Sequence, residues 1–380
     1  MLSHYEVIVI GAGTMGMSAG YFLAKQGVRT LLLDSFEPPH GNGSHHGDTR
    51  IIRHAYGESR QYVPLALSAH KLWHELEEES GQALFQITGV LSVGVEGSPF
   101  IDEEIVSAQT FSLPLEVLQA EEIRKRWPGI IIPDNYVGCF EPASGVLFSE
   151  ECIRAYRKLA LQHGATLLDH TRVQQVDMDQ QGVFVHTDKG VFSADKLIIS
   201  SGAWSGKIMS ELDLPLQPWR KVFAWFESDS SLFQSDVFPA FIFDLPEEHY
   251  YGFPSFRGGG VKIGRRDGGH LVDPDQVNRE FGILPEDEGD VRRFLETHMP
   301  RAAGKLKRGQ VCMFTNTPDL HFIIDQHPTH PHVTIAAGFS GHGFKFGSVV
   351  GEILSQLAVK GETEHDISLF SILRPALRIT

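Results

Sequence analysis

Three glycines and one aspartate near the start of the chain have the types and the spacing of a dinucleotide-binding motif. Gly11, Gly13 and Gly16 form the pattern G-x-G-x-x-G, and Asp34 ends the next apolar run. Such glycines allow a tight turn and let the backbone approach a pyrophosphate, and the carboxylate can accept hydrogen bonds from ribose hydroxyls. The pattern serves FAD and NAD alike, so these residues predict a dinucleotide without choosing between the two.

One thiol lies just before a second glycine-rich stretch near the end of the chain. Cys312, in RGQVCMFTNTPD, precedes AAGFSGHGFKFG at residues 336–347. The other two cysteines are Cys139 and Cys152, and the three have no metal-ligand spacing, which favours a reducing cytoplasm over a disulfide scaffold. A lone cysteine is more often buried and inert than reactive, so its position alone predicts no covalent chemistry.

The hydrophobic pattern predicts the elements that must position these residues. Residues 5–36 are typical of a strand, a helix and a second strand, with the glycines at the first turn. Apolar runs within 163–204 and 332–359 are typical of strands that return to the same sheet, followed by an amphipathic helix. The apolar face of that helix contains Val349, Val350, Ile353, Leu354 and Leu357.

A different pattern fills the intervening stretches. Residues 88–144 and 216–311 alternate with period two, as in VFAWFESD, which is typical of an antiparallel sheet whose one face could form the floor of a pocket. The sequence therefore predicts an α/β (α+β) chain of two domains. These are a Rossmann-like dinucleotide-binding domain from 1–87, 145–215 and 312–380, and an antiparallel-sheet substrate domain from 88–144 and 216–311.

Composition excludes several classes of function. The formal net charge of −15 opposes binding to nucleic acid, which depends on basic residues that neutralise phosphates. The uncharged stretch from Val7 to Ala24 contains four glycines and has no basic leader, which argues against a membrane span or a signal peptide. His321, His327, His330 and His332 lie in a proline-broken segment, predicted to be a surface turn and not a metal site. We expect a cytoplasmic protein without a bound metal.

Several stretches together closely resemble the monomeric sarcosine oxidase family of flavoproteins, which includes N-methyltryptophan oxidase. They are GSHHGDTRIIR at 43–53, YYGFPSF at 250–256, the segment around Cys312, AAGFSGHGFKFG, and TEHDIS.FSI.RPAL at the end. The resemblance runs essentially the whole length of the chain. It implies FAD as the dinucleotide, the fold of the glutathione-reductase-like or D-amino-acid-oxidase type of flavoprotein, and a monomer.

The resemblance also implies the attachment of the cofactor. A cysteine at the place of Cys312 carries FAD through a thioether to the 8-methyl carbon of the flavin, and Arg50 lies in the environment of the flavin ring. The glycine loop before the last helix faces the pyrimidine end, where positive potential stabilises charge on reduced flavin. The expected cofactor-binding residues are Gly11, Gly13, Thr14, Met15, Gly16, Asp34, Ser44, Thr49, Arg50, Val173, Gly202, Trp204, Cys312, Gly341, Gly343, Phe344 and Lys345.

The same resemblance assigns the substrate side. Arg53 and Lys345 contact the substrate carboxylate, since a guanidinium offers two parallel hydrogen bonds to it. Arg50 and Arg53, three residues apart, could share one face of a helical turn. Lys262 is the residue that activates oxygen, although a lysine alternating with Val261 and Ile263 usually faces solvent. Tyr251 and His46 line the same site.

One residue departs from the family pattern. Sarcosine oxidases place a histidine four residues after the oxygen-activating lysine, and this chain has Arg266 there. Arginine is longer and permanently charged, so it disfavours a cationic amine nearby or supplies another contact to a carboxylate. The departure leaves the identity of the substrate open.

The expected function is a flavin-dependent oxidase of secondary amino acids. With sarcosine, O2 and water, the products would be glycine, formaldehyde and hydrogen peroxide. Larger N-methyl amino acids such as N-methyltryptophan, or cyclic imino acids such as proline and pipecolate, are the alternative substrates. Two other functions stay open: a dehydrogenase that uses NAD or another acceptor, and a flavin-containing carboxylate-binding protein in which Arg266 has closed the catalytic site.

Overall fold

A strand, a helix and a second strand begin the chain, as the glycine motif predicts. In the computed structural model, which describes residues 3–180 and 182–378, these elements are β1 (Ser3–Ile10), α1 (Thr14–Lys25) and β2 (Thr30–Leu33). β1 and β2 are parallel, with Val7 opposite Thr30. The second half of β1 and all of β2 are buried, because parallel strands of this type are covered on both faces.

β1 and β2 lie in an eight-stranded sheet whose strands come from three separate parts of the chain. The order is β10-β11-β12-β1-β2-β9, and β20 pairs with both β12 and β19. The later strands are β9 (Thr166–Leu168), β10 (Val173–Asp179), β11 (Gly182–Thr187), β12 (Gly190–Ile199), β19 (Ile323–Gln326) and β20 (Val333–Ala337). The prediction that strands return to the first sheet is thus confirmed. α1 packs between α5 (Ser149–Gln162) and α9 (Gly347–Lys360), and α9 also packs against α2 (Val63–Ser80).

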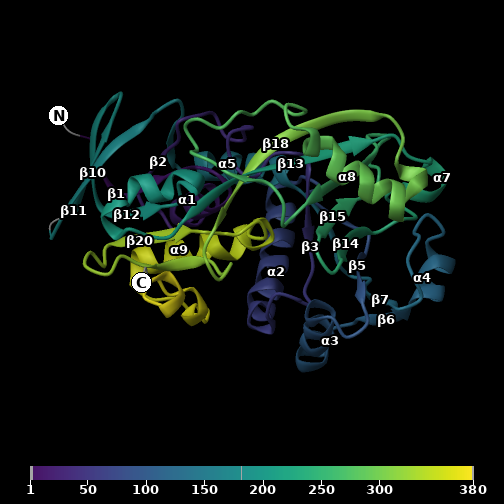
Figure 1. The fold of residues 1–380 in the computed structure, drawn as a ribbon. Helices are drawn as coiled ribbons and strands as arrows, with labels where there is room; N and C mark the ends of the chain where they lie inside the picture. Colours follow the sequence, from purple (N-terminus) through teal and green to yellow (C-terminus); the bar gives the residue numbers. More distant parts are fainter. Residues whose placement is uncertain (1–2, 181, 379–380) are drawn as a thin grey trace.

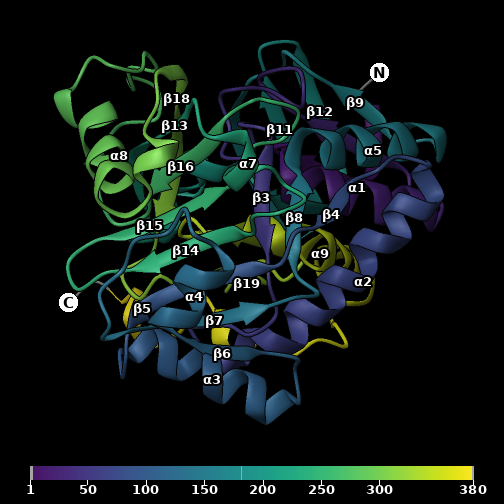
Figure 2. The same cartoon turned by 90° about the vertical axis from the view of Figure 1, so that its right-hand side faces the viewer.

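A nine-stranded sheet lies beside the first one (Figures 1 and 2). Its order is β17-β13-β16-β15-β14-β5-β7-β6, with β18 on β13, and every pair is antiparallel except β14 with β5. α8 (Pro285–His298) covers one face through Val291, Phe294 and Leu295. The strands are β5 (Val90–Val95), β6 (Glu116–Gln119), β7 (Tyr136–Glu141), β13 (Gln217–Phe226), β14 (Ala240–Asp244), β15 (His249–Phe253), β16 (Val261–Arg265), β17 (His270–Leu271) and β18 (Leu306–Asn316).

A small sheet of three strands carries Arg50. β8 (Gly145–Phe148) pairs with β3 (Thr49–Ile52) on one side and with β4 (Phe85–Ile87) on the other. The expected helical turn at Arg50 and Arg53 is therefore wrong: Arg50 lies in a strand, and Arg53 follows its end. The β-branched run TRII favours the extended chain, in which residues three apart point to opposite faces.

Shorter elements complete the chain. They are the helices α3 (Pro99–Phe111), α4 (Ala120–Arg126), α6 (Ser205–Ile208) and α7 (Ser230–Phe233), and the 3-10 helices η1 (Arg60–Tyr62), η2 (Gly202–Trp204), η3 (Ser210–Leu212), η4 (Pro300–Ala302), η5 (Phe344–Phe346), η6 (Ser368–Phe370) and η7 (Pro375–Leu377). None of the helices within the described residues has the length and apolar character needed to cross a membrane. The exact domain boundaries stay a prediction.

Candidate active site

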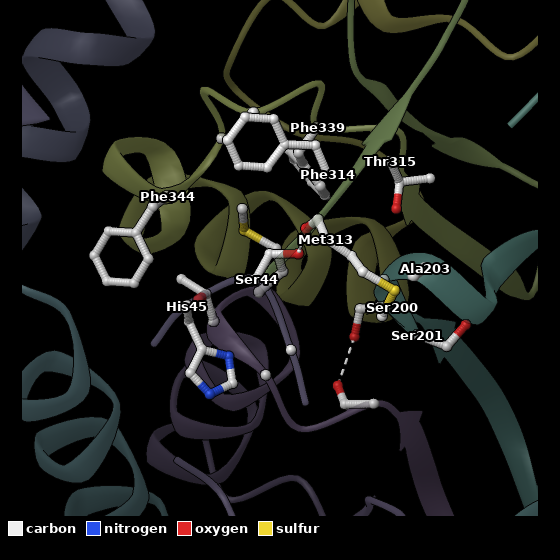
Figure 3. Close-up of a pocket in the computed structure, with 18 of the residues that line it drawn as sticks. Ser44, His45, Ser200, Ser201, Ala203, Met313, Phe314, Thr315, Phe339 and Phe344 are labelled. Carbon is white, nitrogen blue, oxygen red and sulfur yellow. Dashed lines mark hydrogen bonds between the residues drawn. The ribbon is translucent and has the colours of Figure 1, made fainter. Parts of the chain in front are cut away.

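A cavity of about 720 Å³ runs between the two large sheets. One part is lined by the glycine turn after β1, the end of β2 and the 200–204 segment, and another by β3, β15 and the loop before η5. Figure 3 shows how its middle is built, with Ser44 and His45 beside Met313 and Phe314 of β18. The Ser44 hydroxyl donates to the Met313 carbonyl at 2.5 Å, which ties the 40–45 loop to the nine-stranded sheet.

The glycine turn has the shape of a cradle for a pyrophosphate. Gly11 has φ of +88°, and a Cβ placed there would lie 2.6 Å from the Ser200 carbonyl oxygen. A Cβ at Gly16 would lie 1.9 Å from the Gly11 carbonyl oxygen, so only glycine fits both positions. Gly13, Thr14 and Met15 line the cavity at the first turn of α1, where backbone N–H groups attract an anion.

Asp34 lies at the end of β2 and lines the same part of the cavity. Its Oδ2 accepts from the Ala12 N–H and its Oδ1 from the Phe36 N–H, both at 2.9 Å. These bonds fix the carboxylate and leave acceptor positions free, because each carboxylate oxygen can take more than one hydrogen bond. The site therefore fits the ribose and pyrophosphate of FAD.

Two cations, Arg50 of β3 and Lys262 of β16, contact the loop that leads into β3. Arg50 donates to the carbonyl oxygens of Thr49, Ser44 and His46, each at 2.7 Å. Lys262 donates to the carbonyl oxygens of Gly47 at 2.6 Å and Thr49 at 2.9 Å. Carbonyl oxygens hold these cations in place without neutralising them, so the positive charge remains available to a ligand.

Lys262 is buried, unlike the usual lysine of an alternating strand. Its ammonium lies 4.5 Å from the ring centre of Phe253 and 4.8 Å from that of Phe223. Val261 and Ile263 pack under α8, so Lys262 points from β16 toward the small sheet. Burial, and then the charge of Arg50, hold the pKa of Lys262 well below its usual value.

Cys312 lies in β18, opposite Lys221 of β13, and is packed among Phe223, Trp225 and Phe314. Burial raises the pKa of the thiol, whereas the positive charge of Arg50, Lys262, Lys221 and Arg279 acts in the opposite direction.

Most of the predicted site residues line the cavity. The neighbours of Cys312, which are Met313, Phe314 and Thr315, line it as well. Five predicted site residues are not among the lining residues: Cys312, Gly16, His46, Thr49 and Lys262. The other predicted site residues, from Val173, Gly202 and Trp204 to Gly341, Gly343 and Phe344, all line the cavity.

The end of the cavity beyond Arg50 contains three more cations. Arg53 forms ion pairs with Glu58 at 2.6 Å and Glu104 at 2.8 Å. Arg266 reaches Glu58 from the other side at 2.8 Å. Lys345 donates to the His342 carbonyl oxygen at 3.1 Å, and burial, followed by the charge of Arg53, lowers the pKa of Lys345 to about 7.

Tyr251 forms a flat wall at this end. It lies opposite Gly264 in the pairing of β15 with β16. A Cβ at Gly264 would lie 2.6 Å from the Tyr251 hydroxyl oxygen, so the glycine lets the ring lie over β16. Burial raises the pKa of Tyr251, which stays a neutral phenol.

Sequence reasoning missed both carboxylates that contact Arg53. Glu58 lies in a short loop whose residues have no periodicity. Glu104 could have been identified from the sequence. It shares the buried face of α3 with Ile101, Ser107 and Ala108, and an acid on such a face is unexpected. Burial raises the pKa of Glu104 to about 8, and its Oε2 has no hydrogen-bond partner in the described part of the chain.

The histidine-rich segment near residue 327 forms a turn at the surface, as predicted, with Pro328, Thr329 and Pro331 exposed. His327 is buried, and its Nδ1 accepts from the N–H groups of Thr329 and His330. The histidine thus holds the turn together. Among residues 3–180 and 182–378, no group of three or more His, Cys, Asp and Glu side chains is placed to hold a metal ion.

The fold has close counterparts among solved structures. L-proline dehydrogenase from P. horikoshii superposes with a TM-score of 0.84 at 23% identity, covering 98% of this chain and 97% of that one. Glycine oxidase from Geobacillus kaustophilus superposes with a TM-score of 0.83 at 19% identity, covering all of both chains. These likenesses show the fold, and the glycine cradle within it defines the class as a dinucleotide-binding fold.

Sequence comparison narrows that class. The FAD dependent oxidoreductase (DAO) family matches residues 6–357. Monomeric sarcosine oxidase from Bacillus sp. (strain B-0618) is 59% identical over 100% of this chain and 98% of its own. N-methyl-L-tryptophan oxidase from Yersinia pestis (strain Pestoides F) is 40% identical over 97% and 99%. The chain therefore belongs to the FAD dependent oxidoreductase family, in the group of monomeric sarcosine oxidase and N-methyl-L-tryptophan oxidase.

Proposed function

We propose that this protein is an FAD-dependent oxidase of secondary amino acids, with sarcosine and related N-methyl amino acids as the substrate class. The observation that carries the proposal is one continuous cavity with a dinucleotide cradle in one part and Arg53, Arg266 and Lys345 in another. A carboxylate bound to these cations places its neighbouring amine next to the space that a flavin ring would fill. The relatives named for sarcosine and N-methyltryptophan support the same class.

FAD fits the residues that are present. Gly11, Gly13 and Gly16 would hold the pyrophosphate and Asp34 the ribose. Cys312 would carry the flavin through a thioether, supported by the four cations around its thiol. Bound FAD supplies the two-electron acceptor that takes hydride equivalents from the carbon next to the amine and passes electrons to O2. The residues that the sequence predicts to bind the cofactor are all kept as proposed FAD-binding residues.

The side chains around the substrate would prepare it for oxidation. Arg53 and Lys345 bind the carboxylate, and anion binding favours the protonated form of Lys345. The positive charge of Arg266 and Lys345 lowers the pKa of a nearby ammonium, which favours the neutral amine that can be oxidised. Tyr251 covers the site and excludes water, while Arg50 and His46 position the loop before β3.

Lys262 would act in the second half of the reaction. Its ammonium, held by the Gly47 and Thr49 carbonyls, offers fixed positive charge where oxygen becomes negative.

The balanced reaction consumes a secondary amino acid, O2 and water. It yields the primary amino acid, an aldehyde and hydrogen peroxide. We also infer a monomer, in line with the relatives named monomeric sarcosine oxidase, and a cytoplasmic enzyme, supported by three cysteines that are all buried and unpaired.

Anaerobic spectroscopy tests the proposal. Purified protein is mixed with sarcosine, N-methyltryptophan, proline, pipecolate and glycine in turn, and air is then admitted. Bleaching of the flavin by a secondary amino acid, with recovery of colour and peroxide in air, is the expected result. Bleaching without reoxidation by O2 would identify an acceptor-linked dehydrogenase. A spectral shift without bleaching would identify a carboxylate-binding protein.

A further inference from the structure

The substrate end of the cavity contains more positive than negative charge. The cations are Arg53, Arg266 and Lys345, and Glu58 lies between the two arginines, 2.6 Å from one and 2.8 Å from the other. The pKa of Glu58 is held well below its usual range by the two guanidinium groups, so Glu58 is ionised. One carboxylate therefore faces two permanent cations and Lys345, which a bound anion favours in its protonated form.

The remaining titratable groups at this end do not offset the excess. Glu104 contacts Arg53 through Oε1, and burial raises the pKa of Glu104 to about 8, which favours the neutral acid at neutral pH. Burial keeps the pKa of His342 well below its usual value, so His342 is neutral. Asp244 pairs with His249, and Asp267 pairs with Arg265. Glu141, a further acid near Arg53, pairs with His54.

One substrate carboxylate is not enough to balance these charges. If Arg53 and Lys345 bind the carboxylate beside the amine, that carboxylate and Glu58 together offset two of the three cations. The oxidisable amine is neutral and adds nothing. One positive charge remains on the two guanidinium groups that flank Glu58, and Arg266 is the one of these two that is not assigned to the first carboxylate.

Arg266 has the geometry to bind a further anion. It lines the cavity, and its side chain is 27% exposed, so a ligand can reach it. A guanidinium has five N–H donors. In the described part of the chain, the one side-chain acceptor recorded for Arg266 is Glu58, which receives a bond from Nη1. Phe100, Ile242 and Tyr251 line the same end and could contact the carbon chain between two acidic groups.

We propose that Arg266 binds a second carboxylate of the substrate, so that N-methylated dicarboxylic amino acids of the aspartate or glutamate type are oxidised in preference to sarcosine. This inference rests on the proposed function and specifies the substrate class of that same site. Arg266 is thereby a specificity-determining residue. Its contact with Glu58 keeps the guanidinium extended toward the cavity before the substrate arrives.

Binding of unreactive acids tests the contact without turnover. Succinate and butyrate have the same number of carbons, and succinate has one more carboxylate. In the flavin-loaded enzyme, titration followed by the visible flavin spectrum should give a Kd for succinate at least about tenfold lower than that for butyrate. Arg266→Gln should abolish the difference, and Arg266→Lys should retain part of it. The matched control is Arg293→Gln, which removes one positive charge from a side chain that is 54% exposed on α8.

Turnover provides the second readout. N-methylaspartate and N-methylglutamate, each as both enantiomers, are compared with N-methylalanine and sarcosine by kcat/KM. The ratio of dicarboxylate to monocarboxylate should fall by about 30-fold or more in Arg266→Gln. A merely structural role for Arg266 would lower both values equally and leave the ratio unchanged.

The outcomes separate this inference from the function on which it rests. Equal affinity for succinate and butyrate in the wild type, or an unchanged ratio in Arg266→Gln, overturns the inference. If sarcosine still bleaches the flavin in that case, the oxidase function stands. If no secondary amino acid bleaches the flavin, the proposed function itself fails.

Discussion

The ammonium of Lys262 lies 2.6 Å from the carbonyl oxygen of Gly47. This bond joins the middle of β16 to the loop that precedes β3, although the two residues are 215 positions apart in the chain. It holds a buried positive charge in a fixed place, beside Arg50. The cost of burying that charge is large, and function is a reason for a protein to bear it.

Lys262→Met should slow reoxidation of the flavin by O2 far more than its reduction by substrate. The charge is proposed to act on developing negative charge at oxygen, and removal of such a group costs about 100-fold or more in rate. Stopped-flow absorbance measures the two half-reactions separately. Comparable losses of rate in the two half-reactions would show that Lys262 stabilises the structure of the site and does not act on oxygen.

Cys312→Ala should leave the fold intact and release the flavin from covalent attachment. The alanine removes one buried sulfur from a small cluster and leaves the backbone pairing of β18 unchanged. Acid precipitation is the measurement: wild-type protein should precipitate yellow, and the variant should leave its flavin in solution. The chain offers Cys139→Ala and Cys152→Ala as controls, which should precipitate yellow. A yellow Cys312→Ala pellet would place the attachment elsewhere.

Gly16→Ala should reduce loading with FAD severely, because its Cβ would lie 1.9 Å from the Gly11 carbonyl oxygen and would push the cradle open. Gly289→Ala is the matched control, since nothing lies within 4 Å of a Cβ at that helical position. The flavin absorbance per protein, measured after purification, reports the loading. Full loading of Gly16→Ala would mean that the turn can move aside.

Affinity for a monocarboxylate should fall as the pH rises above about 7. Lys345 has a pKa of about 7 in the free protein, so its ammonium is present below that pH and is lost above it. The bound anion favours the protonated form, and proton uptake on binding therefore weakens affinity with increasing pH by up to tenfold per unit. Titration with butyrate between pH 6 and 9 measures this slope. In Lys345→Gln the slope should be shallower, and an unchanged slope would assign the proton to another group.

Glu104→Gln should reduce the loss of stability at alkaline pH. The pKa of Glu104 is raised from 4.5 to about 8 in the folded protein, so the folded state binds the proton more tightly than the unfolded state. That stabilisation is complete below about pH 4.5 and is lost as the pH rises through about 8. Urea unfolding at pH 6, 8 and 9 gives the free energies. Parallel pH profiles for the wild type and the variant would show that Glu104 does not change its protonation between pH 6 and 9, contrary to this prediction.

The local sequence was sufficient to predict the dinucleotide-binding motif. Gly11, Gly16 and Asp34 act through a turn, a helix start and a strand end that all lie within one short stretch. Their relative positions follow from the geometry of a strand, a helix and a parallel strand, which leaves little for distant contacts to decide. The antiparallel pattern of the other sheet was also predictable, because alternation with period two is a local property.

Sequence alone could not decide which side of a strand faces water. Alternation in β16 separates Lys262 from Val261 and Ile263, and a lone strand would leave the lysine exposed. The strand lies between β13 and β15, with α8 on one face and the small sheet on the other, so both faces are buried. Burial is set by what packs on the sheet, and those layers come from distant parts of the chain.

The meeting of Arg53, Glu58 and Arg266 was likewise decided by the tertiary structure. Glu58 and Arg266 are 208 positions apart, and no periodicity connects a loop after β3 with the end of β16. The sequence by itself determined the fold class, the cofactor motif and the candidate cations. Only folding decided which charges oppose one another, because electrostatic interactions depend on distance and burial in space and not on separation along the chain.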